Sequence, residues 1–506
     1  MERRSFLKSS LAGSAAVMMT QFARPIVAKA ERVRRPLPRP VKHRTEMPNI
    51  LWICTDQQRY DTIHALGNQH IRTPNLDRLI ETGVAFTYAH CQGPICTSSR
   101  GSFLTGCYPR PIRSCCNGND KWENAAPLIT KTLADVGYDC GLAGKLHLSA
   151  AYGRVEKRPD DGYRVFHWSH HPTDSWPEGH AYEEWLNSKG TGHTKLKRKY
   201  GYIPPEYHQT TWCTDRAIDF IKEKRTGPWL FSLNCFDPHP PLDPPKQYLD
   251  RFDIDSLPEP PFAPSDIEEQ KRLRDVYFQS GPKQYKGREG KTLLAKYWAM
   301  IELIDDNIGR LIKTIEETGQ RQNTLVIFTS DHGNMVGHHG LLAKGCRFYE
   351  GLVRVPLIFS MPGLVQQNTR NKALVGLVDI TPTLLELAGL PADERMHGKS
   401  LVRQLTGMDS PDQHRDYVYS TYTNTLAYGE KDRKSYGTMI RTRRYKLVNY
   451  HGHGTGELFD MEKDPGEFHN LWDDPDHLRI KMDLMIQSYD LTVRTTNTGS
   501  RITGRY

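Results

Sequence analysis

The chain has 506 residues, of which 37% are hydrophobic, 25% charged and 10% aromatic, a composition typical of a globular enzyme rather than a disordered or collagen-like chain. The formal net charge of +9 comes almost entirely from residues 1–30 and 31–48, which each carry +4 and leave +1 for the rest. A nearly neutral body argues against nucleic-acid binding, and no run of about 18 uncharged apolar residues offers a membrane span.

Residues 1–30 have the pattern of an export signal. Arg3 and Arg4 precede a weakly apolar stretch, and residues 28–30 read Ala-Lys-Ala, a small-residue cleavage pattern. The segment resembles a twin-arginine signal. We therefore expect the Tat translocon to export the protein already folded, to the periplasm or outside the cell. Residues 31–48, rich in arginine and proline, are expected to form a basic, solvated linker.

The body of the chain alternates between strand and helix patterns. Apolar runs predict buried strands at residues 49–54, 229–234, 325–329 and 355–359. Helical periodicity predicts helices at residues 73–83, 211–224 and 293–317. This alternation indicates an α/β fold with a large mixed, mainly parallel sheet sandwiched by helices. Ligands in such folds bind beyond the carboxyl ends of the strands, where polar clusters follow Cys54 and Thr329.

The pattern changes from about residue 406. Aromatic residues alternate at 417–422 and 445–450, and a terminal helix is predicted at 478–489. We therefore expect a catalytic domain over residues 49–405 and a smaller α+β C-terminal subdomain over residues 406–506.

One segment carries a specific signature. Cys96 is followed by Arg100 four residues later and then by the sequence Leu-Thr-Gly ending at Gly106. This segment resembles the signature of the formylglycine-dependent sulfatases, a family of the alkaline-phosphatase-like superfamily. The resemblance implies that a formylglycine-generating enzyme oxidises Cys96 to formylglycine. Ser98 stands where the family usually has proline, inside the pentapeptide that the maturation enzyme reads.

Further motifs follow in the family's order. They are Gly137–His147, Asp237–Pro240, Thr329–Gly333, Gly340–Lys344, Arg354–Pro356, Asp379–Pro382, Glu457–Asp460 and Asp464–Asn470. The resemblance therefore covers nearly the whole mature chain, and it implies an alkaline-phosphatase-like fold. Cys140 stands where the second motif usually has serine or threonine.

The resemblance implies one divalent cation, held by Asp56, Gln57, Cys96, Asp331 and His332. Carboxylate and amide oxygens suit a hard cation that stabilises charge on a sulfate. The family more often has aspartate in place of Gln57 and asparagine in place of His332. Imidazole suits softer ions, so Ca²⁺ is the first expectation by resemblance, with Mn²⁺ or Mg²⁺ as alternatives.

The resemblance also implies the catalytic roles. Hydrated formylglycine from Cys96 attacks sulfur, and Arg100 steadies the modified side chain. His147 accepts a proton from the geminal diol when the sulfated intermediate collapses. Sulfate then leaves as the aldehyde re-forms, without attack by water on sulfur.

Two lysines and a second histidine complete the implied site. Lys145 and Lys344 bind sulfate oxygens as point charges, while His239 hydrogen-bonds sulfate or protonates the leaving oxygen. His339 matches the family's usual histidine at its motif, and His338 is expected to be structural or to line the substrate entrance.

Four neighbouring residues receive supporting roles. Arg59 and Asp61 are expected to support the metal ligands from behind. Arg354 and Asp379 are expected to hold packing and turns rather than to take part in the chemistry.

Three functions remain open at this point. The first is an exported sulfatase acting on a sulfated small molecule or glycan, with residues 150–210 contributing aromatic and histidine side chains that stack on a sugar or pack a lid. The second is a phosphomonoester, phosphodiester or phosphonate hydrolase, since Gln57 and His332 resemble the phosphonate-ester branch. The third is a binding protein in which Ser98 prevents conversion of Cys96.

Overall fold

The computed structural model describes residues 47–151, 153–276, 281–423 and 435–496. The chain divides into two units, residues 1–45 and 46–506, and the first lies outside the described residues. The predicted signal and almost all of the predicted linker therefore lie outside them too. Among the described residues, no helix combines the length and apolarity needed to cross a membrane.

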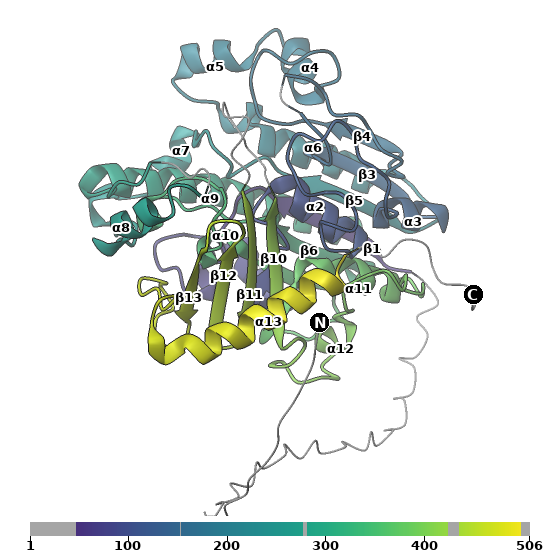
Figure 1. The fold of residues 1–506 in the computed structure, drawn as a ribbon. Helices are drawn as coiled ribbons and strands as arrows, with labels where there is room; N and C mark the ends of the chain where they lie inside the picture. The colour runs from purple at the N-terminus through teal and green to yellow at the C-terminus, as the bar shows by residue number, and fades with distance from the viewer. Residues whose placement is uncertain (1–46, 152, 277–280, 424–434, 497–506) are drawn as a thin grey trace, which may run out of the picture. The chain divides into compact units, whose positions relative to one another are not determined.

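A nine-stranded sheet has the order β4-β3-β5-β1-β6-β8-β2-β7, with β9 also paired to β2 (Figure 1). Strands β4, β3, β5, β1 and β6 are parallel neighbours, and β8 runs antiparallel to both β6 and β2. The predicted mainly parallel sheet is thus confirmed. The strands are β1 (Asn49–Thr55), β2 (Val84–His90), β3 (Asp139–Gly144), β4 (Val165–Trp168), β5 (Trp229–Asn234), β6 (Thr324–Ser330), β7 (Arg354–Val355), β8 (Leu357–Ser360) and β9 (Thr369–Gly376).

The predicted strands at 49–54, 229–234 and 325–329 are confirmed as β1, β5 and β6. All three are buried along their whole length, as central parallel strands are. The predicted strand at 355–359 is divided by Pro356 into β7 and β8, because proline has no N–H to donate to a ladder.

Helices cover both faces of the sheet. Alternate residues of β1 enter two separate cores: Ile50 and Trp52 pack with side chains of α2, α3 and α11, whereas Leu51 and Ile53 pack with those of α1, α6 and α9. The helices are α1 (Pro74–Glu81), α2 (Cys96–Thr105), α3 (Ile129–Asp135), α4 (Ala181–Ser188), α5 (His193–Tyr200), α6 (Gln209–Lys222), α7 (Lys246–Leu249), α8 (Ser265–Arg272), α9 (Gly287–Glu317), α10 (Glu350–Val353), α11 (Ile380–Leu387), α12 (Val402–Leu405) and α13 (Leu478–Arg494). The three helices predicted in the body are confirmed as α1, α6 and α9.

A four-stranded antiparallel sheet follows, in the order β10-β11-β12-β13. Helix α13 lies across it in Figure 1, and the predicted smaller sheet with a terminal helix is confirmed. The strands are β10 (Tyr417–Thr423), β11 (Tyr436–Thr442), β12 (Tyr445–Tyr450) and β13 (Thr455–Asp460). The domain boundary between residues 405 and 406 stays a prediction.

Candidate functional site

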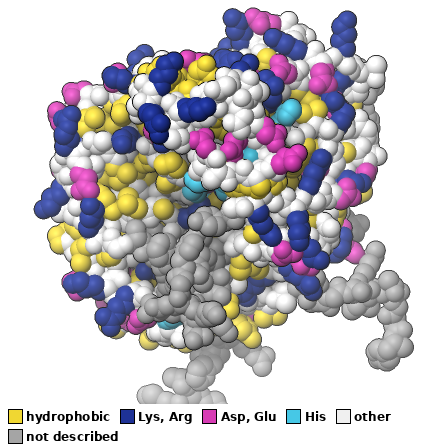
Figure 2. Space-filling model, turned by 90° about the horizontal axis from the view of Figure 1, so that it is seen from above, with side chains coloured by type: hydrophobic (Ala, Val, Ile, Leu, Met, Phe, Trp, Pro, Cys, Tyr) yellow, Lys and Arg dark blue, Asp and Glu magenta, His cyan; other side chains and the backbone are white. Residues whose placement is uncertain are grey.

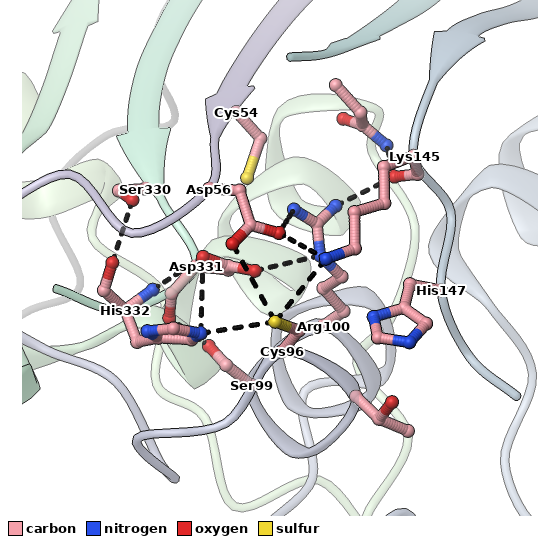
Figure 3. Close-up of polar contacts among 12 residues, drawn as sticks. Cys54, Asp56, Cys96, Ser99, Arg100, Lys145, His147, Ser330, Asp331 and His332 are labelled. Atoms are coloured by element: carbon pink, nitrogen blue, oxygen red, sulfur yellow. Dashed lines mark hydrogen bonds and ion pairs between the residues drawn. The ribbon is translucent and has the colours of Figure 1, made fainter. Parts of the chain in front are cut away.

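The residues that the sequence singles out meet at one edge of the large sheet. Asp56 and Gln57 follow β1, Lys145 follows β3, and Asp331 and His332 follow β6. These strands run parallel, so their carboxyl ends lie side by side, as expected for an α/β ligand site. Figure 3 shows most of these side chains converging on Cys96.

Cys96 is the first residue of α2, a helix whose residues are all buried. Its Sγ lies 2.8 Å from Lys344 Nζ, 3.4 Å from Lys145 Nζ, 3.2 Å from His332 Nε2 and 3.7 Å from Asp56 Oδ1. A helix N-terminus adds a partial positive charge at the same place. An oxygen atom at this position would therefore lie close to the ammonium groups of Lys344 and Lys145 and also close to the Asp56 carboxylate.

Arg100 explains the four-residue spacing from Cys96, because residues i and i+4 share one face of a helix. Its Nε donates to Asp331 Oδ2 at 2.9 Å, and its Nη2 donates to Asp56 Oδ2 at 3.3 Å. Its Nη1 donates to the Lys145 carbonyl oxygen at 2.8 Å. The buried guanidinium thus ties β1, β3 and β6 to α2.

A group of four buried side chains has the chemistry of a cation site. One ligand atom from each of Asp56, Cys96, Asp331 and His332 lies within 4.8 Å of all the others. Burial and the nearby Asp56 carboxylate raise the pKa of Asp331, and a cation between two such carboxylates removes their repulsion. The donor set therefore fits a divalent cation.

Gln57, the fifth predicted ligand, lies beside this group in the left-handed region, with φ of 66°. Its backbone N–H donates to Asp331 Oδ1 at 3.1 Å, and its side-chain Oε1 accepts a hydrogen bond from Asn334 Nδ2 at 2.6 Å. A carbonyl oxygen has two lone pairs, so this hydrogen bond leaves Gln57 Oε1 with one lone pair that can coordinate a cation.

The electrostatics of the site favour an anionic group at position 96. Burial and Asp56 act to raise the pKa of the Cys96 thiol, but Lys145, Lys344 and His332 together bring it well below its ordinary value. Burial also opposes ionisation of Asp56, yet Lys145 and its other cationic neighbours hold the pKa of that carboxyl well below its usual range.

His239 follows β5 and is held in one tautomer. Its Nδ1 lies 2.6 Å from the Pro240 carbonyl oxygen and its Nε2 lies 3.3 Å from Lys344 Nζ. Because carbonyl oxygens only accept and ammonium groups only donate, Nδ1 carries the proton and Nε2 accepts. Burial and Lys344 bring the pKa of His239 well below its ordinary value, so this ring is a neutral base in the resting arrangement.

His147 sits on a strained turn, with φ of 57°. Burial, followed by Lys145 and Arg100, lowers its pKa well below the ordinary value, and no group within the described residues hydrogen-bonds its Nδ1. The turn is held by Glu156, whose carboxylate accepts from the backbone N–H groups of residues 147, 148 and 149 at 2.6, 2.8 and 3.2 Å.

Arg59 and Asp61 pair with each other and reach Gln57 through Asn334, and their expected role behind metal ligands stays a prediction. Arg59 Nε and Nη2 donate to the two oxygens of Asp61 at 2.8 and 2.7 Å. Arg59 Nη1 donates to the Asn334 carbonyl oxygen at 2.9 Å, and the Asn334 side chain in turn holds Gln57.

Several other candidate residues make contacts away from Cys96. His339 Nδ1 lies 2.8 Å from Asp266 Oδ1, and its ring stacks on Tyr349 with 4.1 Å between centroids. His338 Nδ1 lies 3.1 Å from Arg59 Nη2. Arg354 donates to the Thr87 carbonyl oxygen, in keeping with the packing role expected for it.

Asp379 likewise makes contacts of the kind expected for a residue that holds a turn. Its carboxylate accepts from the backbone N–H groups of Gly376 and Lys399 at 3.0 and 2.7 Å, and Arg415 Nε donates to it at 2.9 Å.

The aromatic segment of residues 150–210 mainly packs against itself. Ring centroids are 5.5 Å apart for Trp168 and Trp176, and 5.0 Å apart for Trp176 and His180. His170 reaches the site, with its ring 4.7 Å from that of His147. On the face drawn in Figure 2, basic and acidic side chains are interspersed, with histidines near its middle.

Glu156 and Asn334 are contributors that sequence reasoning missed. Glu156 acts through backbone groups seven to nine residues earlier, a relation that no side-chain spacing reveals. Asn334 lies three residues after Asp331, so its nearness to the third motif is the signal that could have identified it.

Comparison with known proteins agrees with this geometry. The sulfatase family profile matches residues 48–390, and the profile described as the C-terminal region of N-sulphoglucosamine sulphohydrolase matches residues 337–493. An arylsulfatase of Clostridium perfringens is 31% identical over 84% of this chain and 90% of its own length. An N-acetylglucosamine-6-O-sulfatase of Bacteroides thetaiotaomicron is 25% identical over 88% and 86%, respectively.

Among solved structures, a phosphonate monoester hydrolase from Silicibacter pomeroyi superposes with a TM-score of 0.74. It is 25% identical in sequence, and the match covers 89% of this chain and 96% of that one.

Proposed function

The chain belongs to the sulfatase family, a family of sulfuric ester hydrolases, and we propose that it hydrolyses a sulfate ester on a carbohydrate through formylglycine made from Cys96. The observation that carries the proposal is the position of Cys96 Sγ, 2.8 and 3.4 Å from two lysine ammonium groups and within the buried acidic group. A nucleophile placed there attacks a sulfur whose oxygens already have positive partners.

The lysines would neutralise the sulfate. Lys344 and Lys145 offer donors to its nonbridging oxygens, where charge is held as the ester bond breaks. Asp56 accepts from Lys145 Nζ at 2.5 Å, which fixes the ammonium in place before substrate arrives. The fixed charges cost no reorganisation during the reaction.

Two neutral histidines would handle protons. Hydrated formylglycine has one hydroxyl to attack sulfur and a second whose proton must leave when the aldehyde re-forms, and His147 accepts that proton. His239, whose Nε2 lies 3.3 Å from Lys344 Nζ, would take up a proton from solvent at Nε2 and then hydrogen-bond the sulfate or protonate the leaving oxygen, while Lys344 keeps its charge.

We further propose that Asp56, Gln57, residue 96, Asp331 and His332 hold one divalent cation, with Ca²⁺ as our first choice and Mn²⁺ or Mg²⁺ as alternatives. When bound, such a cation polarises sulfate oxygens and lowers the pKa of a coordinated hydroxyl. The maturation partner is a formylglycine-generating enzyme.

A sulfated glycan is the proposed substrate class. The similarity to a sulfatase named for N-acetylglucosamine 6-O-sulfate supports it. The twin-arginine pattern of residues 1–30 supports export through the Tat translocon to the periplasm or outside the cell, where polymeric substrates occur.

Mass spectrometry of the peptide containing Cys96 tests the nucleophile. Protein from a host with sulfatase-maturation activity should carry an aldehyde or its hydrate at position 96 and should release sulfate from an aryl sulfate. A Cys96→Ala variant should fold and release none. An intact thiol in protein isolated from its native host would overturn the proposal and favour the non-catalytic binding function.

A second candidate is hydrolysis of a phosphonate or phosphate ester. His332 in the group of four and Gln57 beside it favour this function, together with the similarity to a phosphonate monoester hydrolase. Sulfur and phosphorus oxyanions are both tetrahedral and therefore need a binding site of similar geometry. Measuring kcat/KM for matched aryl sulfate, phosphate and phosphonate esters decides between the two functions. The ester class that the enzyme evolved to cut should give the highest kcat/KM.

A further inference from the structure

Helix α13 (Leu478–Arg494) packs on the small sheet through one face and leaves the other uncovered. Leu484 and Leu491 enter the core of that sheet with 5% and 7% exposure. The outer face carries large apolar side chains that are 37% to 70% exposed, and no described element covers it in Figure 1. These are Leu478, Met482, Met485, Ile486, Tyr489 and Val493.

At 3.6 residues per turn, these six residues form one stripe roughly 100° wide along the helix. Contiguous apolar stripes of this kind mark interaction surfaces on soluble proteins. We call these six residues the outer stripe.

The outer stripe is symmetric along the helix. Leu478 and Val493, Met482 and Tyr489, and Met485 and Ile486 are each equally distant from one midpoint, which lies between residues 485 and 486. Two identical helices that pack antiparallel about this midpoint bring each residue to the level of its mate on the other copy. A twofold interface requires this self-complementarity.

The charges along one edge of the stripe are complementary in the same arrangement. Arg479 and Asp490 are exposed and 11 residues apart, which is about three helical turns, so both lie on the same edge. Antiparallel packing brings Arg479 of one copy towards Asp490 of the second. Opposite charges at the rim of an interface fix its register.

We propose that the outer stripe of α13 is a homodimer interface, in which a second copy of this chain packs antiparallel against it. The proposal concerns a surface apart from the catalytic residues and does not depend on the substrate. The occupant is a second copy because the apolar stripe is symmetric about one midpoint. Packing about that midpoint also brings Arg479 of one copy to within two residues of the level of Asp490 of the second, so the rim charges are complementary. No unrelated partner requires either feature.

Sedimentation equilibrium on the purified full chain tests the proposal. The wild-type protein should have about twice the 58.0 kDa mass of the chain. Ile486→Asp places two like charges beside the twofold axis and should give a monomer. That monomer should keep its circular dichroism spectrum and its activity on an aryl sulfate. The matched control Gln487→Asp adds the same charge at the next exposed position, outside the stripe, and should remain dimeric.

A charge exchange tests the register. Arg479→Asp and Asp490→Arg should each raise the dimer dissociation constant, by about tenfold, and the double variant should restore it.

Three results would overturn the interface. One is a wild-type protein that stays monomeric over the whole dilution series. The second is a protein that dimerises only after residues 497–506 are removed, which would identify the tail as the occupant. The third is a monomer that binds anionic phosphatidylglycerol vesicles through the stripe, which would identify a lipid surface.

Discussion

Lys344 is the residue whose position tests the proposed chemistry most directly. Its Nζ lies 2.8 Å from Cys96 Sγ and 3.3 Å from His239 Nε2, so its charge stands beside both the proposed nucleophile and the proposed acid. Lys344→Ala should lower kcat/KM for an aryl sulfate by about 10²- to 10³-fold, the usual effect of removing one fixed donor to a developing charge. Steady-state kinetics on fully converted enzyme provide the measurement.

The control is Lys313→Ala, at a side chain that is 74% exposed and should leave kcat/KM unchanged. Lys344→Arg should retain more activity than Lys344→Ala, because guanidinium keeps the positive charge but spreads it over a planar group instead of one compact ammonium. If Lys344→Ala retained wild-type kcat/KM, Lys344 would have no part in binding the sulfate.

Gln57 and His332 are expected to set the metal preference. Both replace residues that offer only oxygen to the cation, and imidazole shifts preference towards softer ions. In metal-stripped protein, Ca²⁺ should raise the thermal midpoint of the double variant Gln57→Asp/His332→Asn more than that of the wild type, whereas Mn²⁺ should stabilise it less. Differential scanning fluorimetry with each metal measures this without relying on activity.

If each metal shifted the thermal midpoint by the same amount in the wild type and in the double variant, neither side chain would determine the metal preference. Gln487→Asp, which adds the same negative charge at an exposed position of α13, is the matched charge control and should leave the metal response unchanged.

At the scale of an element, β3 must end in a glycine for Lys145 to reach the site. Gly144 has φ of 107°, and a Cβ there would overlap the Asn234 carbonyl oxygen of β5. That same carbonyl accepts the Lys145 N–H at 2.9 Å. Gly144→Ala should therefore push the end of β3 away from β5, destabilise the fold by several kcal/mol and displace Lys145, with loss of activity.

Gly137 provides the matched control at the start of the same strand, because it has φ of 101° and a methyl group added to its Cα would have no atom within 4 Å. Gly137→Ala should cost only the strain of a left-handed residue, about 1 to 2 kcal/mol, and keep kcat. Urea unfolding and kinetics of both variants separate strain from overlap. Equal losses would show that the approach of β3 to β5 has no special role.

The sequence predicts the elements that are periodic and the residues that end them. Apolar runs locate β1, β5 and β6, and the polar residues just after β1 and β6 indicate where the group that could hold a cation lies. Pro356 limits the prediction at β7 and β8, because an apolar run does not reveal where a ladder is interrupted. Glu156 could not be predicted, because its contacts with the His147 turn depend on how a long irregular segment folds back. For His170, the sequence predicts only a histidine within residues 150–210 that stacks on a sugar or packs a lid, not its contact with His147.

At the scale of the whole molecule, acid should destabilise the fold through buried histidines. Burial lowers the pKa of His180 from 6.5 to about 4, so the folded state takes up this proton less readily than the unfolded state. The resulting stability is complete above pH 6.5 and is lost as the pH falls towards 4, amounting to about 3 kcal/mol. His180→Gln should flatten the pH dependence of urea unfolding in this range, and an unchanged slope would contradict the assignment.

The two sheets are joined by buried charges. Lys446 of β12 donates to Glu350 Oε1 of α10 at 3.3 Å and to the Phe348 carbonyl oxygen at 2.8 Å, and it also pairs with Glu467. All three charged side chains are at most 5% exposed. Burial disfavours ionisation of Glu350, yet Lys446 and His90 hold its pKa well below the usual range. Lys446 therefore neutralises charge on two buried carboxylates, and Arg354 and Arg441 also pair with Glu350.

Removing that lysine should be far more costly than removing an exposed one. Lys446→Met leaves the buried Glu467 carboxylate without its lysine and leaves Glu350 with Arg354 and Arg441 only. It should destabilise the protein by about 3 to 5 kcal/mol at pH 7, whereas Lys313→Met should cost less than about 0.5 kcal/mol. Burial already raises the pKa of Glu467, and the loss of Lys446 should raise it further, so the deficit should shrink as the pH falls from 7 towards 4.5 and Glu467 becomes protonated. Urea unfolding at several pH values measures the deficit, and Glu467→Gln in the Lys446→Met background should recover part of it at pH 7. A deficit that stays constant with pH would mean that lost packing, not the stranded charge, destabilises the variant.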